Sequence, residues 1–551
     1  MQESPLPTDP QALASALEQF EQRERLQLAT DAILETALRD RLPLKETLTT
    51  LFAPLAHHLK IESAFVRTYD EALELRDFHW SGPGARPFPI AIESFCAQQE
   101  PLGEQGDGWT ALGQQLDVAG QSFGYAGVTL AGRLDASQAQ RARDLLNTWS
   151  EVLDNRLAAV AQSRKKHQLT LELSDALKTP VLHRGIDRAI AVLQENIGFR
   201  DLVLLFRNSQ DPDSTLAYKV IRDRNLVFDS PTQRSEEIDA FIAEDRGSAL
   251  DDRFTELVEY FGITSFCEEV MISGVQEQQV VGRLVISSPN EAFNTFDRDL
   301  LERFADFLRQ RIVDFNREWS HLSLCFAPPT VDRLLGEPRY QQRLEPTEED
   351  VAILFCDISG FTRVSEQILK SPALIGKLIN TWSQRVVEIV WESAGVFDKM
   401  VGDCTIALWG PPFFEMSARE ACRQAANAAL EIREYTKSLS HARELPELAG
   451  IDPPLGVATG LNYAPLFVGR FGPNKDYTGF SSGMNNTARL QGVAVRDEIL
   501  CMQRFAAILE GEAAFGEIRQ AQVKKLAAPL AFKALEQIAP DGANAPAAHR
   551  R

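Results

Sequence analysis

Two acidic turns beside predicted strands constrain the fold of this chain more than any other feature. The run VAILFCDISGFT (351–362) places Asp357 at the end of an apolar segment that predicts a buried strand. The segment FDKMVGDCTIALWG (397–410) predicts a hairpin whose tip holds Asp403, 46 residues beyond Asp357. Each carboxylate is therefore expected at a turn that leaves or joins a strand.

Further polar residues follow these aspartates in a fixed order. Lys399 stands four residues before Asp403, and DYTGFSSGMNNTARLQG (476–492) carries Asn485 and Arg489 four residues apart. A spacing of four places Asn485 and Arg489 on one face of a helix. Each residue alone has a structural explanation, such as a turn aspartate or an exposed helix arginine. In this order, however, the set can bind a metal, a base and a triphosphate.

The ordered set resembles the catalytic domain of the class III nucleotide cyclases, which convert ATP or GTP to a cyclic monophosphate. The resemblance covers roughly residues 345 to 540. It includes LGVATGLNYAPLFVGRFGPNKDYTGF (455–480), which is similar to a glycine-punctuated strand-and-loop stretch of that family. The resemblance implies a ferredoxin-like α+β catalytic domain.

The same resemblance implies the roles of the site residues. Asp357, the backbone carbonyl of Ile358 and Asp403 would hold two Mg²⁺ or Mn²⁺ ions per active site, and these hard cations prefer oxygen ligands. Such ions lower the pKa of an attacking hydroxyl and neutralise phosphate charge. Arg489 would stabilise the triphosphate in the transition state, and Asn485 would orient the ribose.

Base selection is expected from Lys399 and Thr478, the latter seven residues before Asn485. Adenine presents an acceptor at N1 and a donor at N6, which match a lysine donor and a hydroxyl acceptor. The lysine–threonine combination resembles the subgroup that includes bicarbonate-responsive adenylate cyclases, so bicarbonate is a candidate regulator. ATP is favoured as substrate. A guanylate cyclase and an inactive cyclase-like signalling scaffold are the alternatives.

Two details depart from the pattern of the relatives. Ser481 and Ser482 stand where relatives often have a Gly-Asp or Gly-Glu pair, which leaves the rate open but not the reaction type. Lys524 and Lys525 fall where relatives carry a phosphate-contacting lysine, and the sequence does not choose between them.

The first 320 residues contain a duplication with an interval of roughly 150 residues. Each half has an early strand, a later glycine-containing strand and a closing helix, which indicates an α+β unit. The stretch VVGRLVISSPNEAFNTFDRDLLERFADFL (280–308) resembles the end of a GAF domain, which implies two sensor domains for an unknown small-molecule ligand. The strands of the two halves are predicted at 63–70 and 123–132, then at 201–208 and 280–288.

Both closing helices carry apolar residues at steps of three and four. Such a stripe packs either on its own domain or against a second chain, and we favour a parallel dimer seam because the resembled enzymes are homodimers with active sites shared between chains. The stripes are Leu146, Trp149, Leu153, Leu157 and Val160, then Leu301, Phe304, Leu308, Ile312, Phe315 and Trp319.

Composition excludes several classes of function. The formal net charge of −21 argues against a nucleic-acid partner, which needs a basic face. No run of about eighteen apolar residues predicts a membrane span, and the N-terminus lacks the features of a secretory signal. The seven scattered cysteines indicate reduced thiols and hence a cytoplasmic protein.

The predicted organisation has six parts. They are an N-terminal segment (1–24), a first GAF-like domain with its closing helix (25–160), a second one (161–319), an irregular connector (320–345), the cyclase catalytic domain (346–540) and a disordered tail (541–551).

Overall fold

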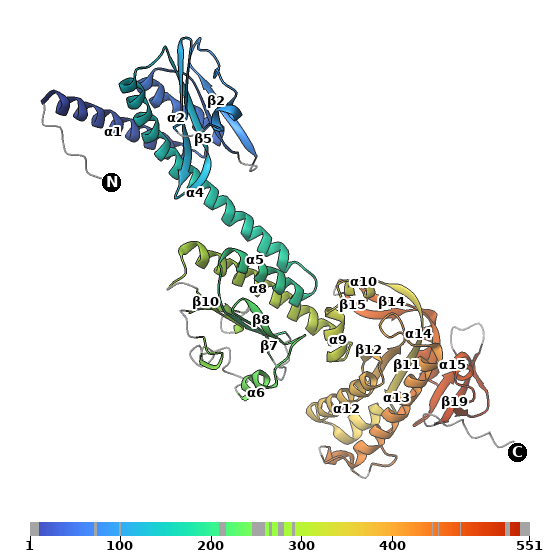
Figure 1. Cartoon of the computed structure of the whole chain (residues 1–551). Helices are drawn as coiled ribbons and strands as arrows, with labels where there is room; N and C mark the ends of the chain where they lie inside the picture. The colour runs from blue at the N-terminus through green and yellow to red at the C-terminus, as the bar shows by residue number, and fades with distance from the viewer. Residues whose placement is uncertain are drawn as a thin grey trace. The chain divides into compact units, whose positions relative to one another are not determined.

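The computed structural model describes most of the chain, and Figure 1 shows its helices and strands. The described residues are 10–70, 74–98, 101–208, 216–244, 259–263, 267–273, 280–288, 292–443, 445–449, 451–473, 475–523 and 529–539. They belong to two compact units, residues 1–169 and 170–551. The tail predicted at 541–551 and the lysine pair Lys524 and Lys525 lie outside the described residues.

The first unit is a five-stranded antiparallel sheet with helices on it. Its strands are β1 (Ile61–Tyr69), β2 (Leu75–Ser81), β3 (Gly103–Gly106), β4 (Trp109–Val118) and β5 (Gln121–Ala131), in the order β2-β1-β5-β4-β3. Its helices are α1 (Pro10–Arg39), α2 (Leu44–Leu59), α3 (Ile92–Cys96) and the start of α4 (Ala136–Leu177). Trp149 anchors the core, because its ring stacks on Phe52 at 5.2 Å and its Nε1 donates to the Leu51 carbonyl at 2.9 Å.

The second unit begins with a similar arrangement of strands. The first and last strands of each sheet pair antiparallel, β1 with β5 and β6 with β10. The helices here are α5 (Leu182–Asn196), α6 (Glu236–Glu244) and α8 (Thr295–Leu322). The strands are β6 (Leu202–Phe206), β7 (Ala217–Arg222), β8 (Asn225–Asp229), β9 (Cys267–Ser273) and β10 (Val280–Ser287), in the order β8-β7-β6-β10-β9.

Apart from the half-buried Val160, the residues of the two apolar stripes pack inside their own units, so the predicted dimer seam is wrong for these buried residues. In α4, Leu146, Trp149, Leu153 and Leu157 belong to the core of the first unit. In α8 the predicted stripe residues are also buried within the chain, with Leu308 and Ile312 fully covered. A periodic stripe reports that one helix face is covered, and here the domain itself covers it.

Two predicted boundaries fall inside helices, and the predicted irregular connector is partly helical. The boundary at 24/25 falls inside α1, and the boundary at 160/161 falls inside α4, which runs unbroken from Ala136 to Leu177. The connector at 320–345, expected to be irregular, contains the helices α9 (Pro328–Leu335) and α10 (Tyr340–Arg343). Pro328 did not break a helix, because proline is well tolerated in the first helical turn.

The C-terminal part of the second unit is built on a nine-stranded sheet. The strand order is β12-β13-β11-β14-β16-β19-β17, with β15 paired to β14 and β18 paired to β19. The strands are β11 (Thr347–Ile358), β12 (Val396–Val401), β13 (Cys404–Trp409), β14 (Val457–Phe471), β15 (Asp476–Phe480), β16 (Ile499–Met502), β17 (Ala513–Phe515), β18 (Arg519–Ala521) and β19 (Leu530–Ile538). β11 and β14 pair over twelve positions at its centre.

Helices cover this sheet and complete its core. The helical segments are α11 (Phe361–Arg363), η1 (Val364–Leu369), α12 (Pro372–Glu392), α13 (Ala418–Ser438), η2 (Leu439–His441), η3 (Pro446–Leu448), α14 (Ser482–Gln491) and α15 (Gln503–Ile508). Trp382 of α12 is fully buried and donates its Nε1 hydrogen to Thr436 of α13 at 2.9 Å. None of the helices in the described part of the chain is long and apolar enough to cross a membrane.

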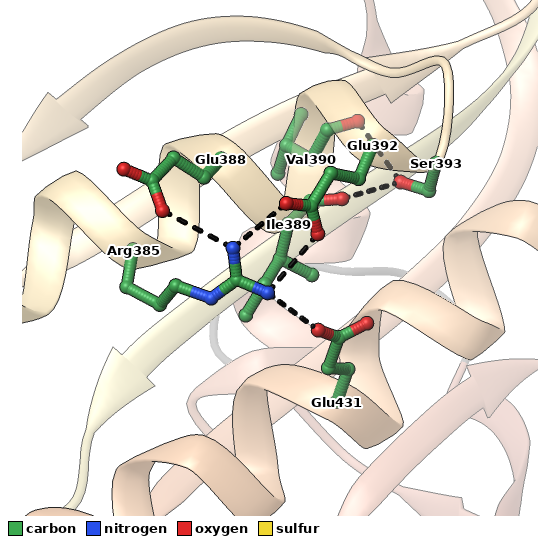
Figure 2. A network of polar contacts seen from close by, with 7 residues as sticks. All are labelled: Arg385, Glu388, Ile389, Val390, Glu392, Ser393 and Glu431. Carbon is green, nitrogen blue, oxygen red and sulfur yellow. Dashed lines mark hydrogen bonds and ion pairs between the residues drawn. The ribbon is translucent and has the colours of Figure 1, made fainter.

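A charged network joins α12 to α13 on the outside (Figure 2). Arg385 donates to Glu392 at 2.8 and 3.0 Å, to Glu388 at 3.1 Å and, across the helix pair, to Glu431 at 2.9 Å. These hydrogen bonds raise the pKa of Arg385. One guanidinium thus holds three carboxylates that would otherwise repel one another.

The buried carboxyl of Asp154 in α4 generates a prediction on stability. Burial raises its pKa from 3.8 to about 7, and the charges of Asp117 and Glu151 add to the rise. Because the folded state then holds a proton that the unfolded state releases, stability should fall as the pH rises from about 4 to about 7 and level off above. Asp154→Asn should raise the melting temperature most at pH 8 and least at pH 5.

Differential scanning calorimetry of the full chain at pH 5, 6, 7 and 8 measures this difference. Asp107→Asn is the matched control, because Asp107 lies in the same unit with a fully exposed side chain. A gain that does not depend on pH, or an equal gain in the control, would contradict the assignment.

Candidate active site

The two predicted metal aspartates face each other at one end of the sheet. Asp357 is the penultimate residue of β11, and its register partner is Cys404, the first residue of β13. Asp403 precedes Cys404 in the turn between β12 and β13, where Gly402 has a positive φ of 66° that suits glycine. Burial raises the pKa of Asp357 to about 7, and the charge of Asp403 and their shared hydrogen bond add to the rise.

This donor set fits a divalent cation. Two carboxylates in contact disfavour each other's charge, and a cation between them would favour the doubly ionised state. The backbone carbonyl of Ile358, at the end of β11, is the third oxygen that sequence analysis proposed. Within the described residues no group of three or more His, Cys, Asp or Glu side chains could hold a metal. Two aspartates with open positions suit Mg²⁺, which keeps water and substrate oxygens as ligands.

The predicted base-reading residues meet in the folded chain. Lys399 lies on β12 and Thr478 on β15, 79 residues apart, and the Lys399 Nζ donates to the Thr478 Oγ1 at 2.7 Å. The side chain of Lys399 is 43% exposed, whereas Thr478 is buried. The pair therefore forms a polar patch with a buried acceptor and a donor that reaches solvent.

Asp398 is a third member of this patch that sequence analysis missed. Its side chain is fully buried, and its Oδ1 lies 3.7 Å from the Lys399 Nζ. The signal was present, because a second acidic residue stands immediately before Lys399 in the FDK sequence. In a regular strand, neighbouring side chains point to opposite faces, so the sequence pattern places Asp398 away from Lys399.

Asn485 and Arg489 lie on α14, as their spacing predicted. Ser481 caps this helix, because its Oγ accepts from the backbone N–H groups of Gly483 at 2.9 Å and Met484 at 3.4 Å. Asn485 is exposed, and Arg489 is half-buried with its Nη1 donating to Asn486 at 3.3 Å. Ser481 thus has a structural role in starting the helix, and Ser482 is its first residue.

The predicted site residues form separate groups within one chain. Asp357 pairs with Asp403, and Lys399 pairs with Thr478. Among the described residues, no hydrogen bond or ion pair joins these two groups to each other or to Asn485 and Arg489. One chain therefore carries all of these groups, but they do not bind one another directly within it.

The segment before the catalytic sheet contacts both strands of the base-reading patch. The Cys325 carbonyl accepts from the Phe397 backbone N–H at 3.0 Å, one residue before Asp398. The Phe326 ring packs on Tyr477 at 5.2 Å, one residue before Thr478. These contacts were not predicted.

An ion pair adds a further link from helix α8. Arg470 of β14 donates to Glu318 of α8 at 2.8 Å, and both side chains are largely buried, with exposures of 15% and 28%. Arg470 is also the register partner of Tyr477 in β15. The end of α8 is thus tied to the hairpin that carries Thr478.

Comparison with known proteins identifies the catalytic part. Residues 344–531 match the family model described as the adenylate and guanylate cyclase catalytic domain. Among curated proteins, the photoactivated adenylate cyclase subunit alpha of Euglena gracilis is 28% identical over 116 residues. That match covers 21% of this chain and 11% of the relative, and a subunit alpha-like protein of the same organism matches equally. The chain thus spans about a tenth of the length of these relatives.

Solved structures of cyclases also match. The adenylyl cyclase CyaB from P. aeruginosa is 26% identical, covering 35% of this chain and 97% of that chain, with a TM-score of 0.32. The guanylyl cyclase Cya2 is 19% identical, covering 36% and 98%, with a TM-score of 0.32. The family-model match coincides with the sheet that carries the facing aspartates and the Lys399–Thr478 pair. Residues 344–531 are a catalytic domain of the adenylate and guanylate cyclase type.

Proposed function

We propose that this protein is an adenylate cyclase that converts ATP to 3′,5′-cyclic AMP and pyrophosphate. The observation that carries the proposal is the Lys399–Thr478 contact of 2.7 Å inside a cyclase catalytic domain. It brings together a donor and an acceptor that match the N1 and N6 positions of adenine. A guanine edge presents the opposite order, so the Lys399 ammonium would meet the N1–H donor of guanine instead of an acceptor.

The residues of the chain divide the chemistry between them. The ribose 3′-hydroxyl attacks the α-phosphate, the bond from the α-phosphorus to the bridging oxygen breaks, and pyrophosphate leaves. Asp357 and Asp403, with the Ile358 carbonyl, would hold divalent cations that lower the pKa of the attacking hydroxyl and neutralise the triphosphate. Arg489 donates to the phosphates as charge builds there, and Asn485 orients the ribose. Catalysis in this class is mainly positioning and charge stabilisation.

Product analysis tests the reaction and the choice of base together. Purified full-length protein with Mn²⁺ should form cyclic AMP from ATP faster than cyclic GMP from GTP. Lys399→Glu should reduce ATP use more than GTP use, since a lost matched contact costs about 1–3 kcal/mol. Liquid chromatography of the products measures both rates.

The outcomes separate the alternatives. A preference for GTP in the wild-type protein would make it a guanylate cyclase. Absence of any cyclic product with either nucleotide would favour an inactive signalling scaffold. An unchanged ATP-to-GTP ratio in Lys399→Glu would remove that residue from the base pocket.

The active form is proposed to be a homodimer with shared sites. The metal aspartates of one protomer would face Lys399, Thr478, Asn485 and Arg489 of the other, as the resemblance to class III cyclases implies. Among the described residues, no hydrogen bond or ion pair within one chain joins these groups, which agrees with this division. An aromatic cluster on the β14–β15 hairpin supplies a candidate contact surface, since Phe467 is 47% and Phe480 is 56% exposed and both flank Phe471.

Mixing two inactive variants tests the shared site. Asp403→Asn and Arg489→Ala should each lose at least about a hundredfold in rate, because each removes a charge-stabilising group. In a mixed dimer one site carries both lesions and the other carries none. Mixing should therefore restore activity, up to about half of the wild-type rate per mixed dimer if the sites act independently.

Two tags on the two variants, followed by tandem purification, isolate the mixed dimer for assay. Glu517→Gln is the matched control, because Glu517 is an exposed carboxylate in a loop of the same domain and should leave the rate unchanged. Inactive mixed dimers would show instead that each site lies within one chain.

The N-terminal region is proposed to regulate this activity through two GAF-like domains that bind a small molecule. Support comes from the contacts of α8 and the connector with the strands that carry Asp398, Lys399 and Thr478. The cysteine usage expected from sequence is consistent with a cytoplasmic setting. Bicarbonate is a second candidate effector.

Breaking the link between α8 and the hairpin tests this coupling. Glu318→Gln removes the charge that holds Arg470, so the hairpin that carries Thr478 should spend less time in its active position. We expect kcat for ATP to fall about fivefold, the lower end of typical coupling energies. Glu302→Gln, an exposed carboxylate on the same helix, is the matched control. Equal rates in both variants would contradict a path through this ion pair.

A further inference from the structure

A buried carboxylate whose polar contacts are longer or less well aligned than ordinary hydrogen bonds lies beside the base-reading pair. The side chain of Asp398 is fully buried, and neither carboxylate oxygen has a hydrogen bond of ordinary distance and angle. The Lys399 ammonium lies 3.7 Å from the Asp398 Oδ1. Burying a charge without good hydrogen bonds costs folding free energy. Native proteins therefore keep such a charge mainly where it has a functional role.

A β-bulge explains why Asp398 points at this patch. β12 pairs with β13 through Phe397↔Ala407 and Lys399↔Ile406, so Asp398 is an extra residue with no register partner. A bulge breaks the strict alternation of side chains and re-aims one of them. As a result, the Lys399 ammonium lies 2.7 Å from the Thr478 Oγ1 and 3.7 Å from the Asp398 Oδ1, and the Asp398 carboxyl interacts with the Thr478 hydroxyl although Asp398 and Lys399 are neighbours in sequence.

Among the groups that act on the Asp398 carboxyl, Thr478 and Lys399 are those that favour its ionised form. Burial raises its pKa, and the hydroxyl of Thr478 and the charge of Lys399 both counter the rise. On the other side, the Cys325 thiol and the Tyr477 ring are neutral at ordinary pH, and burial raises the pKa of each. Lys399 and Thr478 are thus the groups that can stabilise an ionised Asp398.

We propose that Asp398 is a positioning residue that sets the adenine specificity of the site by orienting the hydroxyl of Thr478. The inference rests on the proposed reading of adenine by Lys399 and Thr478. An ionised carboxylate only accepts hydrogen bonds, so the Thr478 hydroxyl must turn its hydrogen towards Asp398. Its lone pairs then face Lys399 and the base.

This orientation decides which base fits. With its hydrogen turned inwards, Thr478 can accept from the N6 amino group of adenine. The O6 carbonyl of guanine needs a donor at that place and would meet lone pairs instead. A hydroxyl that is free to rotate could serve either base, so the threonine alone does not discriminate. The buried carboxylate supplies the missing discrimination.

The test measures kcat/KM for ATP and GTP in the full-length protein with Mn²⁺. Asp398→Asn keeps the shape but offers both a donor and an acceptor to Thr478, so its hydroxyl can turn outwards. The ATP-to-GTP ratio should fall about tenfold or more. Thr478→Val should also lower the ratio, and the double variant should be no less selective than Thr478→Val alone, because Asp398 acts through the hydroxyl.

Two controls separate this role from a structural one. Thr478→Ser keeps the hydroxyl and should keep the ratio. Asp476→Asn removes a charge from the same strand, where the Asp476 side chain is 66% exposed, and should also leave the ratio unchanged. If Asp398→Asn is too slow to assay, equilibrium dialysis of ATP and GTP should show the same loss of preference.

The outcomes are distinguishable. If Thr478→Val lowers the ratio but Asp398→Asn reduces ATP and GTP use equally, the positioning role is wrong and the proposed function stands. The positioning role is also wrong, and the proposed function stands, if the ATP-to-GTP ratio of the double variant falls by the product of the two single losses. Asp398 would then act independently of Thr478. If Thr478→Val leaves the ratio unchanged, the threonine does not read the base, and both the base assignment and this inference fail.

Discussion

The pairing of β11 with β14 is the constraint on which the catalytic domain depends. Twelve residue pairs, from Thr347↔Val468 to Ile358↔Val457, hold these strands at the centre of the sheet, and β11 is buried over most of its length. A shift of one residue would turn every side chain to the other face, so this register is strongly specified. It places Asp357 at one end of β11, and the continuation of β14 into β15 carries Thr478.

Charge is left incompletely compensated at the candidate site on this scaffold. Asp357 and Asp403 face each other, and Asp398 is buried beside Lys399 without a full set of hydrogen bonds. Elsewhere in the same domain an exposed carboxylate cluster is fully engaged, as in the Arg385 network of Figure 2. Stability is commonly given up where binding or catalysis needs unsatisfied groups. At the aspartate pair a cation would complete the interactions, and beside Lys399 a base would.

The closing helices α4 and α8 do not have the role that the periodicity of their apolar residues suggested. Apart from the half-buried Val160, the residues of their predicted apolar stripes are buried inside their own units. The end of α8 instead contacts the catalytic domain through Glu318, Cys325 and Phe326 in and just after the helix. The exposed aromatic residues of the β14–β15 hairpin are a better candidate for contact between protomers. We thus propose that the β14–β15 hairpin serves both the contact between protomers and the coupling to α8.

Local pattern alone determined the kind and place of the main elements. The apolar run before Asp357, the glycine turn before Asp403 and the four-residue spacing of Asn485 and Arg489 each depend on neighbours in sequence, and each element is present. Tertiary structure alone decided which groups meet. Lys399 reaches Thr478 across 79 residues, a bulge turns Asp398 towards them, and the closing helices face inwards. A periodic pattern specifies that a face will be covered, but the partner that covers it depends on the packing of distant segments, and short-range patterns do not encode that choice.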